Sequence, residues 1–380
     1  MTIFLSVFLL LYWSMHAYLF CKLRAAFALS RAGTISAVAF LLLMVFAPVF
    51  IRYAERAGME TVARATAWTG FLWMGWLLLF CASAFSMDIY RGIIFIAERL
   101  TGQGLASMSV STAIAFLLSS GLALATAAYG FFEARNVRAE HLEVPTTKLP
   151  EGIDRVRIAQ ISDVHLGLIQ REPLLRQVAE IVQKENPDML VSTGDLVDGQ
   201  ICAYNNLSAI LAGIRPRYGK FAITGNHEFY AGIKEAKCFI EDAGFTLLRG
   251  QRINLGNIMT IAGVDDPAVR QLKLGALVNE KDLLADVPAE RFRLLLKHRP
   301  SIDKGAIGLF DLQLSGHVHK GQIFPFSILT WLYYPLQSGF ADLGGGSSLY
   351  VSRGTGTWGP PIRVLSPPEV TIIDIVRRGK

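Results

Sequence analysis

The sequence predicts an N-terminal bundle of four membrane-spanning helices followed by an α/β domain, and three observations support this fold class. Long apolar runs dominate the first third of the 380 residues, whereas the remainder alternates short apolar runs with polar loops. Five short polar motifs in the remainder each follow an apolar run. These motifs hold five of the seven histidines. Because the composition changes near residue 135, we predict a membrane anchor at 1–132, a linker at 133–150 and the α/β domain at 151–380.

Four apolar stretches in the first third approach the roughly 20 residues that a helix needs to cross a bilayer. They are apolar all round rather than on one face, which argues against a soluble helical bundle. They contain no Asp, Glu, Lys or Arg, so we expect an anchor rather than a transporter or a proton relay. A signal peptide is not expected, because the first stretch lacks a basic start and three more follow. The stretches cover residues 3–21, 36–51, 68–87 and 109–132.

The charges of the chain bear on its orientation and its partners. With 22–31 and 91–99 counted as loops on one side of the membrane, five basic residues flank the stretches on each side. The positive-inside rule therefore leaves open on which side of the cell membrane the α/β domain of this multi-pass protein lies. The net charge of +6 is modest and no basic helix carries interleaved aromatics, so we expect no nucleic acid partner. The four cysteines form no close pair, which predicts neither a disulfide framework nor a zinc knuckle.

From residue 151 the sequence alternates β-rich runs with candidate crossover helices. A helix predicted at 172–185 carries an apolar stripe, and a second is predicted at 233–243. The stretch 245–264 alternates enough to hold strands of a second sheet. In open α/β sheets, ligands gather beyond the carboxyl ends of the strands, where all five polar motifs are placed. The strands that precede the motifs are expected at 156–161, 189–191, 221–224, 292–296 and 312–314.

The first two motifs offer carboxylates and one imidazole. A turn after a strand can aim Asp163 and His165 at one ion, although such a pair by itself is more often structural. Gly194 permits a tight turn before Asp195. The Asp195 carboxylate could bridge two cations about 3.5–4 Å apart. We expect Asp198 to support this loop through hydrogen bonds instead.

The other three motifs add an amide and four imidazoles. Asn226 offers an amide oxygen to a metal, and the adjacent His227 could face the substrate and protonate a leaving oxygen. The alternative for this motif is an Asn-capped turn with a surface histidine. His298 alone would most often be a core histidine, whereas His317 and His319 lie on one side of an extended segment, as a metal pair would. Because order, spacing and strand-end placement agree in all five motifs, we predict a centre for two divalent metals.

The set of motifs resembles that of the calcineurin-like metallophosphoesterase superfamily, over about residues 153–380. The superfamily pattern is D-x-H, G-D-x-x-D, G-N-H-[ED], H and G-H-x-H, and each part is present here. The C-terminal sequence resembles a membrane- or wall-associated bacterial branch, which often has glycine at the position of Lys320. The resemblance implies two packed mixed sheets flanked by helices. It also implies in-line attack on phosphorus by a water that two metal ions activate.

Carried over by position, the resemblance implies two ligand sets that share one aspartate. The first metal would be held by Asp163, His165, Asp195 and His319, and the second by Asp195, Asn226, His298 and His317. His227 would be the catalytic acid. Mn, Fe and Zn all occur in such sites, so the ligands leave the identity of the two ions open.

The stretch 323–334 bears on the substrate because it is strongly apolar and aromatic. It is either a buried strand with a turn or an apolar lip that receives a lipid tail or docks on a bilayer. With the membrane anchor, the second interpretation favours a phosphodiesterase or pyrophosphatase that acts on a lipid-linked substrate. Some members of the superfamily cleave UDP-diacylglucosamine, which would require a cytoplasmic α/β domain.

Two alternatives stay open at the level of the sequence. A phosphomonoesterase acting on small phosphates would keep its activity on short soluble monoesters. A non-catalytic sensor would keep the metals and bind a phosphorylated ligand, but the presence of His227 argues against it. The sequence makes no prediction about the oligomeric state.

Overall fold

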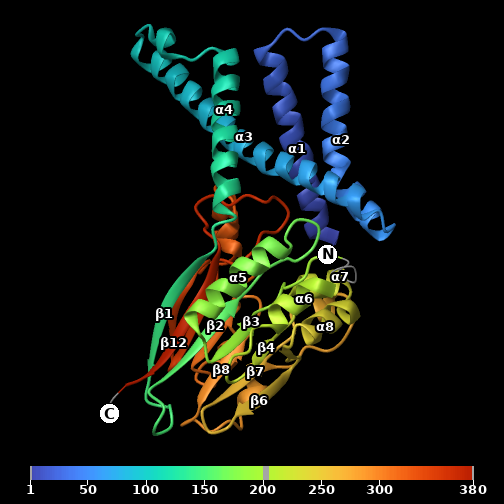
Figure 1. Cartoon of the computed structure of the whole chain (residues 1–380). Helices are drawn as coiled ribbons and strands as arrows, with labels where there is room; N and C mark the ends of the chain where they lie inside the picture. Colours follow the sequence, from blue (N-terminus) through green and yellow to red (C-terminus); the bar gives the residue numbers. More distant parts are fainter. Residues whose placement is uncertain (1, 200–204, 379–380) are drawn as a thin grey trace. The chain divides into compact units, whose positions relative to one another are not determined.

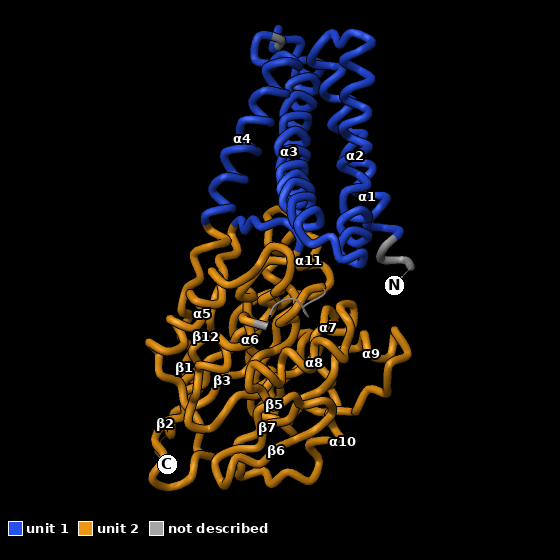
Figure 2. Tube along the Cα trace, turned by 45° about the vertical axis from the view of Figure 1, so that its right-hand side comes forward, with its two compact units in different colours: residues 1–132, 359–364 blue, residues 133–358, 365–380 orange. Residues whose placement is uncertain are grey.

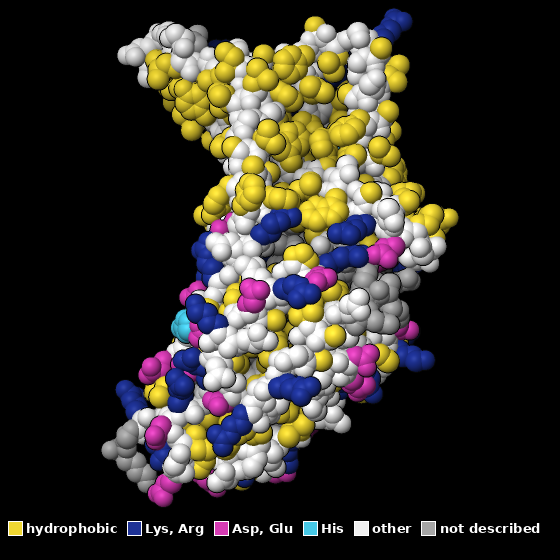
Figure 3. All heavy atoms as spheres, viewed as in Figure 1, with side chains coloured by type: hydrophobic (Ala, Val, Ile, Leu, Met, Phe, Trp, Pro, Cys, Tyr) yellow, Lys and Arg dark blue, Asp and Glu magenta, His cyan; other side chains and the backbone are white. Residues whose placement is uncertain are grey.

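The structure is a computed structural model that describes residues 2–199 and 205–378. It divides into two compact units (Figure 2). The helical unit comprises Met1–Phe132 and Gly359–Val364, and the α/β unit comprises Glu133–Trp358 and Leu365–Lys380. On the face drawn in Figure 3, hydrophobic side chains cover the helical unit, whereas charged side chains are spread over the α/β unit. Among the cysteines, Cys202 lies outside the described residues, and Cys21, Cys81 and Cys238 are free.

Four long helices make up most of the helical unit (Figure 1), and each is long and apolar enough to cross a membrane. They are α1 (Thr2–Ala26), α2 (Arg31–Arg56), α3 (Glu60–Thr101) and α4 (Thr112–Glu133), with a short 3-10 turn at Leu105–Met108. The loop assumed at 91–99 is wrong, because α3 continues through it. At 1.5 Å per residue the 42 residues of α3 extend about 63 Å, roughly twice a bilayer core, so only part of the helix can lie in hydrocarbon.

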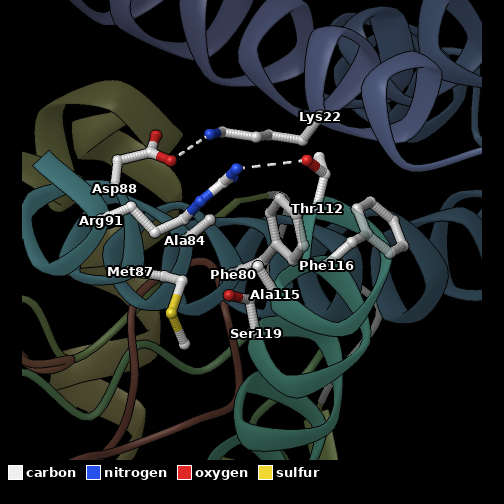
Figure 4. Close-up of a pocket in the computed structure, with 10 residues that line it drawn as sticks. All are labelled: Lys22, Phe80, Ala84, Met87, Asp88, Arg91, Thr112, Ala115, Phe116 and Ser119. Carbon is white, nitrogen blue, oxygen red and sulfur yellow. Dashed lines mark hydrogen bonds and ion pairs between the residues drawn. The ribbon is translucent and has the colours of Figure 1, made fainter. Parts of the chain in front are cut away.

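Charged side chains meet at the ends of the predicted apolar stretches, where they line a small pocket of the helical unit (Figure 4). Lys22 of α1 forms an ion pair with Asp88 of α3, and Tyr18 donates a hydrogen bond of 2.6 Å to the same carboxylate. Arg91 of α3 donates to Thr112 Oγ1 of α4 at 3.3 Å. These contacts join three helices, and the charges lie beyond the apolar stretches rather than inside them.

The helical unit also contains the short segment Gly359–Val364. Ile362 packs against glycines of two helices, because a Cβ on Gly75 or on Gly130 would collide with its side chain. Arg363 N donates to Gly130 O at 2.9 Å. The chain therefore changes unit three times, after Phe132, after Trp358 and after Val364.

The α/β unit holds two six-stranded mixed sheets. The first sheet has the order β1 (Arg138–Thr146), β12 (Glu369–Arg377), β2 (Arg155–Ile161), β3 (Met189–Ser192), β4 (Lys220–Ala222) and β5 (Thr246–Leu247). The second has the order β10 (Gly339–Gly344), β11 (Ser347–Val351), β9 (Leu312–Ser315), β8 (Phe292–Leu296), β7 (Met259–Gly263) and β6 (Gln251–Leu255). Strands β2 to β5 are mutually parallel, as are β7, β8, β9 and β11, which brings their carboxyl ends to one edge of each sheet.

The two sheets pack face to face and helices cover their outer faces, which confirms the expected architecture. Successive side chains of a strand point to opposite faces. In β8, Leu294 and Leu296 lie in the core between the sheets, whereas Leu295 lies in the outer core. In β2, Ile158 faces the other sheet and Ile161 faces the helices. The covering helices are α5 (Glu172–Glu185), α6 (Asn205–Ala212) and α8 (Ile233–Asp242) on the first sheet and α10 (Glu280–Leu284) on the second.

The predicted helices and strands of the α/β unit lie within two residues of the observed ones, but two segments differ. Residues 138–146, inside the predicted linker, form β1, which pairs with β12 along its whole length. This edge strand is mostly exposed and rich in charge, so its sequence lacks the apolar signal of a strand. The buried-strand interpretation of 323–334 is wrong, because the stretch contains the helix α11 (Phe326–Tyr333) and none of its eight residues, all of them described, is buried.

Candidate metal centre

The predicted site residues come together where the parallel strands of the two sheets end. The first sheet presents residues that follow β2 and β3 and residues of the short helix α7 (Asn226–Ala231), which follows β4. The second sheet presents residues that follow β8 and β9. All are buried except His317, which is partly exposed. From the first sheet they are Asp163, His165, Asp195, Asn226 and His227, and from the second His298, His317 and His319.

One cluster consists of Asp163, His165 and His319, whose ligand atoms lie within 4.8 Å of one another. His319 Nε2 is 3.3 Å from Asp163 Oδ1 and 3.1 Å from His165 Nε2. Two ligands that are each about 2.1 Å from one ion lie about 3.0–3.5 Å apart. Two of the three pairs match this spacing and the third, His165 Nε2 to Asp163 Oδ1, is longer at 4.0 Å, so the cluster could hold a single divalent ion after a small movement of one side chain.

A second cluster consists of Asp195, His298 and His317. His298 Nε2 lies 3.1 Å from Asp195 Oδ2 and 3.1 Å from His317 Nδ1. The buried Asn226 Oδ1 has no hydrogen-bond partner among the described residues, a costly arrangement that a metal ion would relieve. Asp195 Oδ2 also lies 3.9 Å from His165 Nε2 of the first cluster. This set of imidazole, carboxylate and amide donors fits two divalent ions that share Asp195.

The glycines of the motifs let neighbouring loops pass directly against these side chains. A Cβ on Gly225 would collide with the Asp195 carboxylate, and one on Gly316 would collide with the Asp163 carboxylate. Gly194 has φ +95°, a conformation that side chains other than glycine rarely adopt. Glycine is therefore required at these positions by the close approach of the loops.

Several of the clustered residues adopt left-handed backbone conformations themselves. Their φ values lie between 49° and 71°. In this region the conformational strain of a residue with a Cβ is roughly 1–3 kcal/mol. Such strain persists only where the surrounding structure fixes it, and it concentrates at functional sites. The residues are Asp163, His165, Asp195, His317 and His319.

Glu228 organises the loop that carries Asp195, although the sequence did not mark it as a site residue. Its carboxylate accepts backbone N–H groups from Gly225 at 2.6 Å and Leu196 at 2.7 Å. It accepts two more from Asp195 at 3.0 Å and Val197 at 3.2 Å. Burial and the nearby Asp195 carboxylate raise the pKa of Glu228 to about 7, against the N–H donors, which favour the ionised form. The sequence signals Glu228 as the acidic position of the G-N-H-[ED] motif, and it lies three positions after the helix N-cap Gly225.

His227 lies at the edge of the centre and pairs with Asp198. His227 Nδ1 is 3.0 Å from Asp198 Oδ1, and His227 N donates to Asp195 Oδ1 at 2.8 Å. A ligand atom of His227 also lies within 4.8 Å of those of His165 and Asp195. Asp198 was expected to support its own loop through hydrogen bonds, and in the structure its carboxylate contacts the His227 imidazole.

The protonation of the centre suits metal binding. Burial lowers the pKa of His165 to about 3, and burial likewise keeps the pKa of His317 well below its usual value. Burial would raise the pKa of Asp195, but the neighbouring His298 outweighs it and the carboxylate stays ionised. Burial would also lower the pKa of His298, but Asp195 raises it to about 10. Ligands must be deprotonated to bind a metal, so binding at His298 releases a proton.

Aromatic rings that the sequence did not predict as site residues surround the histidines. Tyr230 and Trp358 lie edge-to-face against His227, with ring centroids 5.5 and 6.3 Å away. Tyr334, the residue after α11, lies edge-to-face against His317 at 5.7 Å. Tyr230 lies three residues after His227 in α7, whereas Trp358 and Tyr334 reach the histidines from other segments of the chain, so no local pattern signals those two.

Arg299, whose position is fixed by an ion pair, adds positive charge beside the second cluster. Arg299 follows His298 directly, and its guanidinium binds Asp266 through Nε at 2.7 Å and a second nitrogen at 3.0 Å. Such a two-point pair fixes the direction of the guanidinium. Its charge, together with burial, contributes to the low pKa of His317.

Two mixed sheets with a buried histidine and aspartate centre at their strand ends define a candidate two-metal hydrolase. Residues 156–321 match the calcineurin-like phosphoesterase family. A metallophosphoesterase of Aquifex aeolicus is 40% identical over 260 residues, which cover 68% of this chain and 99% of that protein. The chain therefore belongs to the calcineurin-like metallophosphoesterase family, whose members use a dinuclear metal site and act on phosphorylated substrates.

Other similar proteins include one that is named as a transmembrane protein. A "Transmembrane protein with metallophosphoesterase domain" of Danio rerio is 30% identical over 310 residues, 78% of this chain and 70% of that protein. A metallophosphoesterase of Campylobacter jejuni is 35% identical over 249 residues, 64% of this chain and 63% of that protein. The crystal structure of a dimetal phosphatase from Danio rerio aligns with 58% of this chain and 92% of its own, at 12% identity and a TM-score of 0.38.

Proposed function

We propose that this chain is a membrane-anchored phosphoesterase that hydrolyses a phosphodiester or pyrophosphate bond with two divalent metal ions. The observation that carries the proposal is the position of Asp195 between the two clusters. Its Oδ2 is 3.1 Å from His298 Nε2 and 3.9 Å from His165 Nε2. A carboxylate in this position can serve as the bridge that two ions about 3.5–4 Å apart require.

The ligand assignment follows the two clusters. When bound, such ions act as Lewis acids that lower the pKa of a bound water and neutralise the phosphoryl oxygens. Mn, Fe and Zn all suit this mixture of nitrogen and oxygen donors. We assign Asp163, His165, Asp195 and His319 to one ion and Asp195, Asn226, His298 and His317 to the other.

His227 is the proposed general acid. Its Nδ1 faces Asp198 at 3.0 Å, so the hydrogen bond orients the ring and the carboxylate stabilises the imidazolium form. The opposite ring nitrogen, Nε2, is then directed away from Asp198 and can deliver a proton to the leaving oxygen of the substrate. The charge of Arg299 beside the second cluster suits the negative charge of the phosphoryl group.

The substrate we propose is lipid-linked, with UDP-diacylglucosamine as a candidate. The support comes from the four helices that can cross a membrane, which would place the enzyme in the cell membrane as a multi-pass protein. Membrane lipid is then a constant neighbour of the α/β unit. A phosphomonoesterase with small soluble substrates and a metal-containing phosphate sensor are the competing functions.

The proposal predicts that His227→Asn removes most of the activity without removing the metals. Full-length protein in detergent is given a chromogenic phosphodiester and the corresponding monoester, with and without added Mn²⁺. Loss of a general acid lowers kcat by about 10²–10⁴-fold. His141→Asn, a substitution of an exposed histidine on β1, is the matched control and leaves kcat unchanged.

The same assay separates the competing functions. Preferential cleavage of the monoester supports a phosphomonoesterase. No turnover of either ester by protein that has bound its metals supports a sensor. An unchanged rate in His227→Asn contradicts the role of His227 as the general acid.

A further inference from the structure

The segment that follows the last metal-binding motif carries no charge. Between Lys320 and Asp342 the sequence contains no Asp, Glu, Lys, Arg or His, and its middle reads FPFSILTWLYY. A run of this composition in a soluble domain is normally buried, because apolar surface is costly to leave in water. In this chain it forms α11 (Phe326–Tyr333) instead of a core strand.

The side chains of α11 are exposed. Trp331, Leu332 and Tyr333 have 57%, 69% and 78% of their surface accessible, and Ile328 and Leu329 each have 53%. Phe326 at the start of α11 and Phe324 just before the helix are also exposed. Single exposed apolar residues are ordinary, but a contiguous patch of this kind marks a surface that contacts another apolar phase.

The helix is held firmly beside the metal centre. Gln337 Nε2 donates to Ser327 O at 2.6 Å and to Thr330 Oγ1 at 2.8 Å. These hydrogen bonds connect the segment just before β10 to α11. A Cβ on Gly321 would collide with the backbone of Ser327, so the helix starts directly against the turn that carries His319. The apolar surface is therefore a fixed feature of the α/β unit.

The chain itself indicates what covers this surface. Gln322 is bound twice to Trp358, through Nε2 to the carbonyl and through Oε1 to the N–H, both at 2.9 Å. Trp358 is the last residue before the chain passes to the helical unit at Gly359. That unit contains the four helices that can cross a membrane. Helices with exposed Trp, Tyr, Phe and Leu are typical of the boundary between lipid headgroups and acyl chains.

We infer that α11 is an interfacial helix that inserts its exposed face into the bilayer crossed by the helices of the same chain. This docking places the metal centre at the membrane surface, with Tyr334 linking α11 to His317. The inference rests on the proposed function in one respect, because it specifies a phosphate on a membrane lipid as the class of substrate. The acyl chains of such a lipid stay in the bilayer while its phosphate reaches the centre.

The test measures contact between α11 and lipid without reference to activity. The four native cysteines are replaced by serine, and one cysteine is introduced at Leu332 for labelling with bimane. The full-length protein is reconstituted into phosphatidylcholine vesicles with and without brominated acyl chains, which quench a buried fluorophore. Leu274→Cys is the control, since Leu274 is also an exposed leucine, at 51%, outside α11.

The expected result is a blue shift and quenching by brominated lipid at Leu332→Cys, with little access for iodide in the aqueous phase. Leu274→Cys is expected to behave in the opposite way. Equal quenching at the two positions overturns the inference. Protection of Leu332→Cys from both quenchers also overturns it, because the surface is then covered by protein, either within the chain or from a second copy.

A second measurement connects the docking to the substrate. Leu329→Glu and Leu332→Glu are expected to lower kcat/KM for a lipid-linked phosphodiester and to leave the rate for a soluble chromogenic diester unchanged. If brominated lipid quenches Leu332→Cys but the centre cleaves no ester, the docking stands and the proposed enzymatic function fails. If both rates survive the glutamate substitutions, α11 has no part in the use of lipid substrates.

Discussion

At the scale of the residue, the centre depends on a few buried polar groups that act through backbone hydrogen bonds. Glu228 is fully buried and does not belong to either ligand cluster, yet it accepts four backbone N–H groups. Three of those groups belong to the loop that begins with Asp195, and the fourth belongs to the turn before Asn226. Glu228 therefore fixes the proposed bridging carboxylate and the proposed amide ligand relative to each other.

Glu228→Gln is expected to destabilise the fold by about 3 kcal/mol, because an amide has only one acceptor oxygen and its NH₂ faces N–H donors. The measurement is denaturant unfolding of the full-length protein in detergent. Glu241→Gln on α8 provides the control, since its pair with Lys237 is exposed and worth little. An equal loss in the two variants would contradict the role of Glu228.

At the scale of the element, the ends of the predicted strands indicated which candidate ligands would lie together, because parallel strands bring their carboxyl ends to one edge. The rest could not be predicted from local patterns. The four donors to Glu228 come from two loops about 30 residues apart in the sequence, and Trp358 contacts His227 from a distant part of the chain. An apolar run by itself does not show whether it lies in a core or on an exposed surface, so the sequence of residues 323–334 fits both interpretations.

The close packing of Gly316, in the turn that follows β9, can be tested by a single substitution. Gly316→Ala places a methyl group against the Asp163 carboxylate, so overpacking of about 1–3 kcal/mol and loss of bound metal are expected. Unfolding and metal content of the purified protein measure both effects. At the control position Gly305, the nearest atoms to a Cβ lie at 3.4 and 3.8 Å, so Gly305→Ala is expected to be nearly neutral. Normal metal content in Gly316→Ala would refute the close-approach argument.

The shifted pKa of Lys220 in β4 should make the free energy of unfolding depend on pH. Lys220 is buried, and its Nζ donates to Leu211 O of α6 and Ala243 O at the end of α8, each at 2.6 Å. Burial, with a smaller effect of Arg215, lowers the pKa of Lys220 to about 8. An unfolded lysine titrates near about 10.4, so between these values the unfolded state binds more protons. Below about pH 8, Lys220 is charged in both states, so the folded state carries the full free-energy cost of burying the charge.

The free energy of unfolding of the natural protein, minus that of Lys220→Met, is therefore expected to rise from about pH 8 to about pH 10. The subtraction removes the titration of all other groups. Unfolding curves at several pH values give this difference directly. A difference that stays flat across the range would show that Lys220 titrates normally in the folded state, and a difference that falls would show that its pKa is raised there; either result contradicts the prediction.

At the scale of the whole molecule, the chain joins a helical unit and an α/β unit through three passages. Composition alone predicted the two parts, because helices that face lipid are apolar all round and soluble helices are not. The return of Gly359–Val364 to the helical unit had no such signal, since it depends on the packing of Ile362 against glycines of α3 and α4. The metal centre and α11 belong to one unit and the candidate membrane spans to the other, so the proposed function requires the full chain.

The most direct test of a two-metal centre is to titrate metal into chelated, full-length protein while following both the bound ions and the hydrolysis of a chromogenic phosphodiester. We expect no turnover without metal and recovery as a second ion binds to each chain. Asp195→Ala, which lacks the proposed bridge, should stay inactive. Hydrolysis of the diester by metal-free protein would contradict the assignment of this centre as a two-metal phosphoesterase. Protein that binds two ions but cleaves neither the phosphodiester nor the corresponding monoester would contradict it as well.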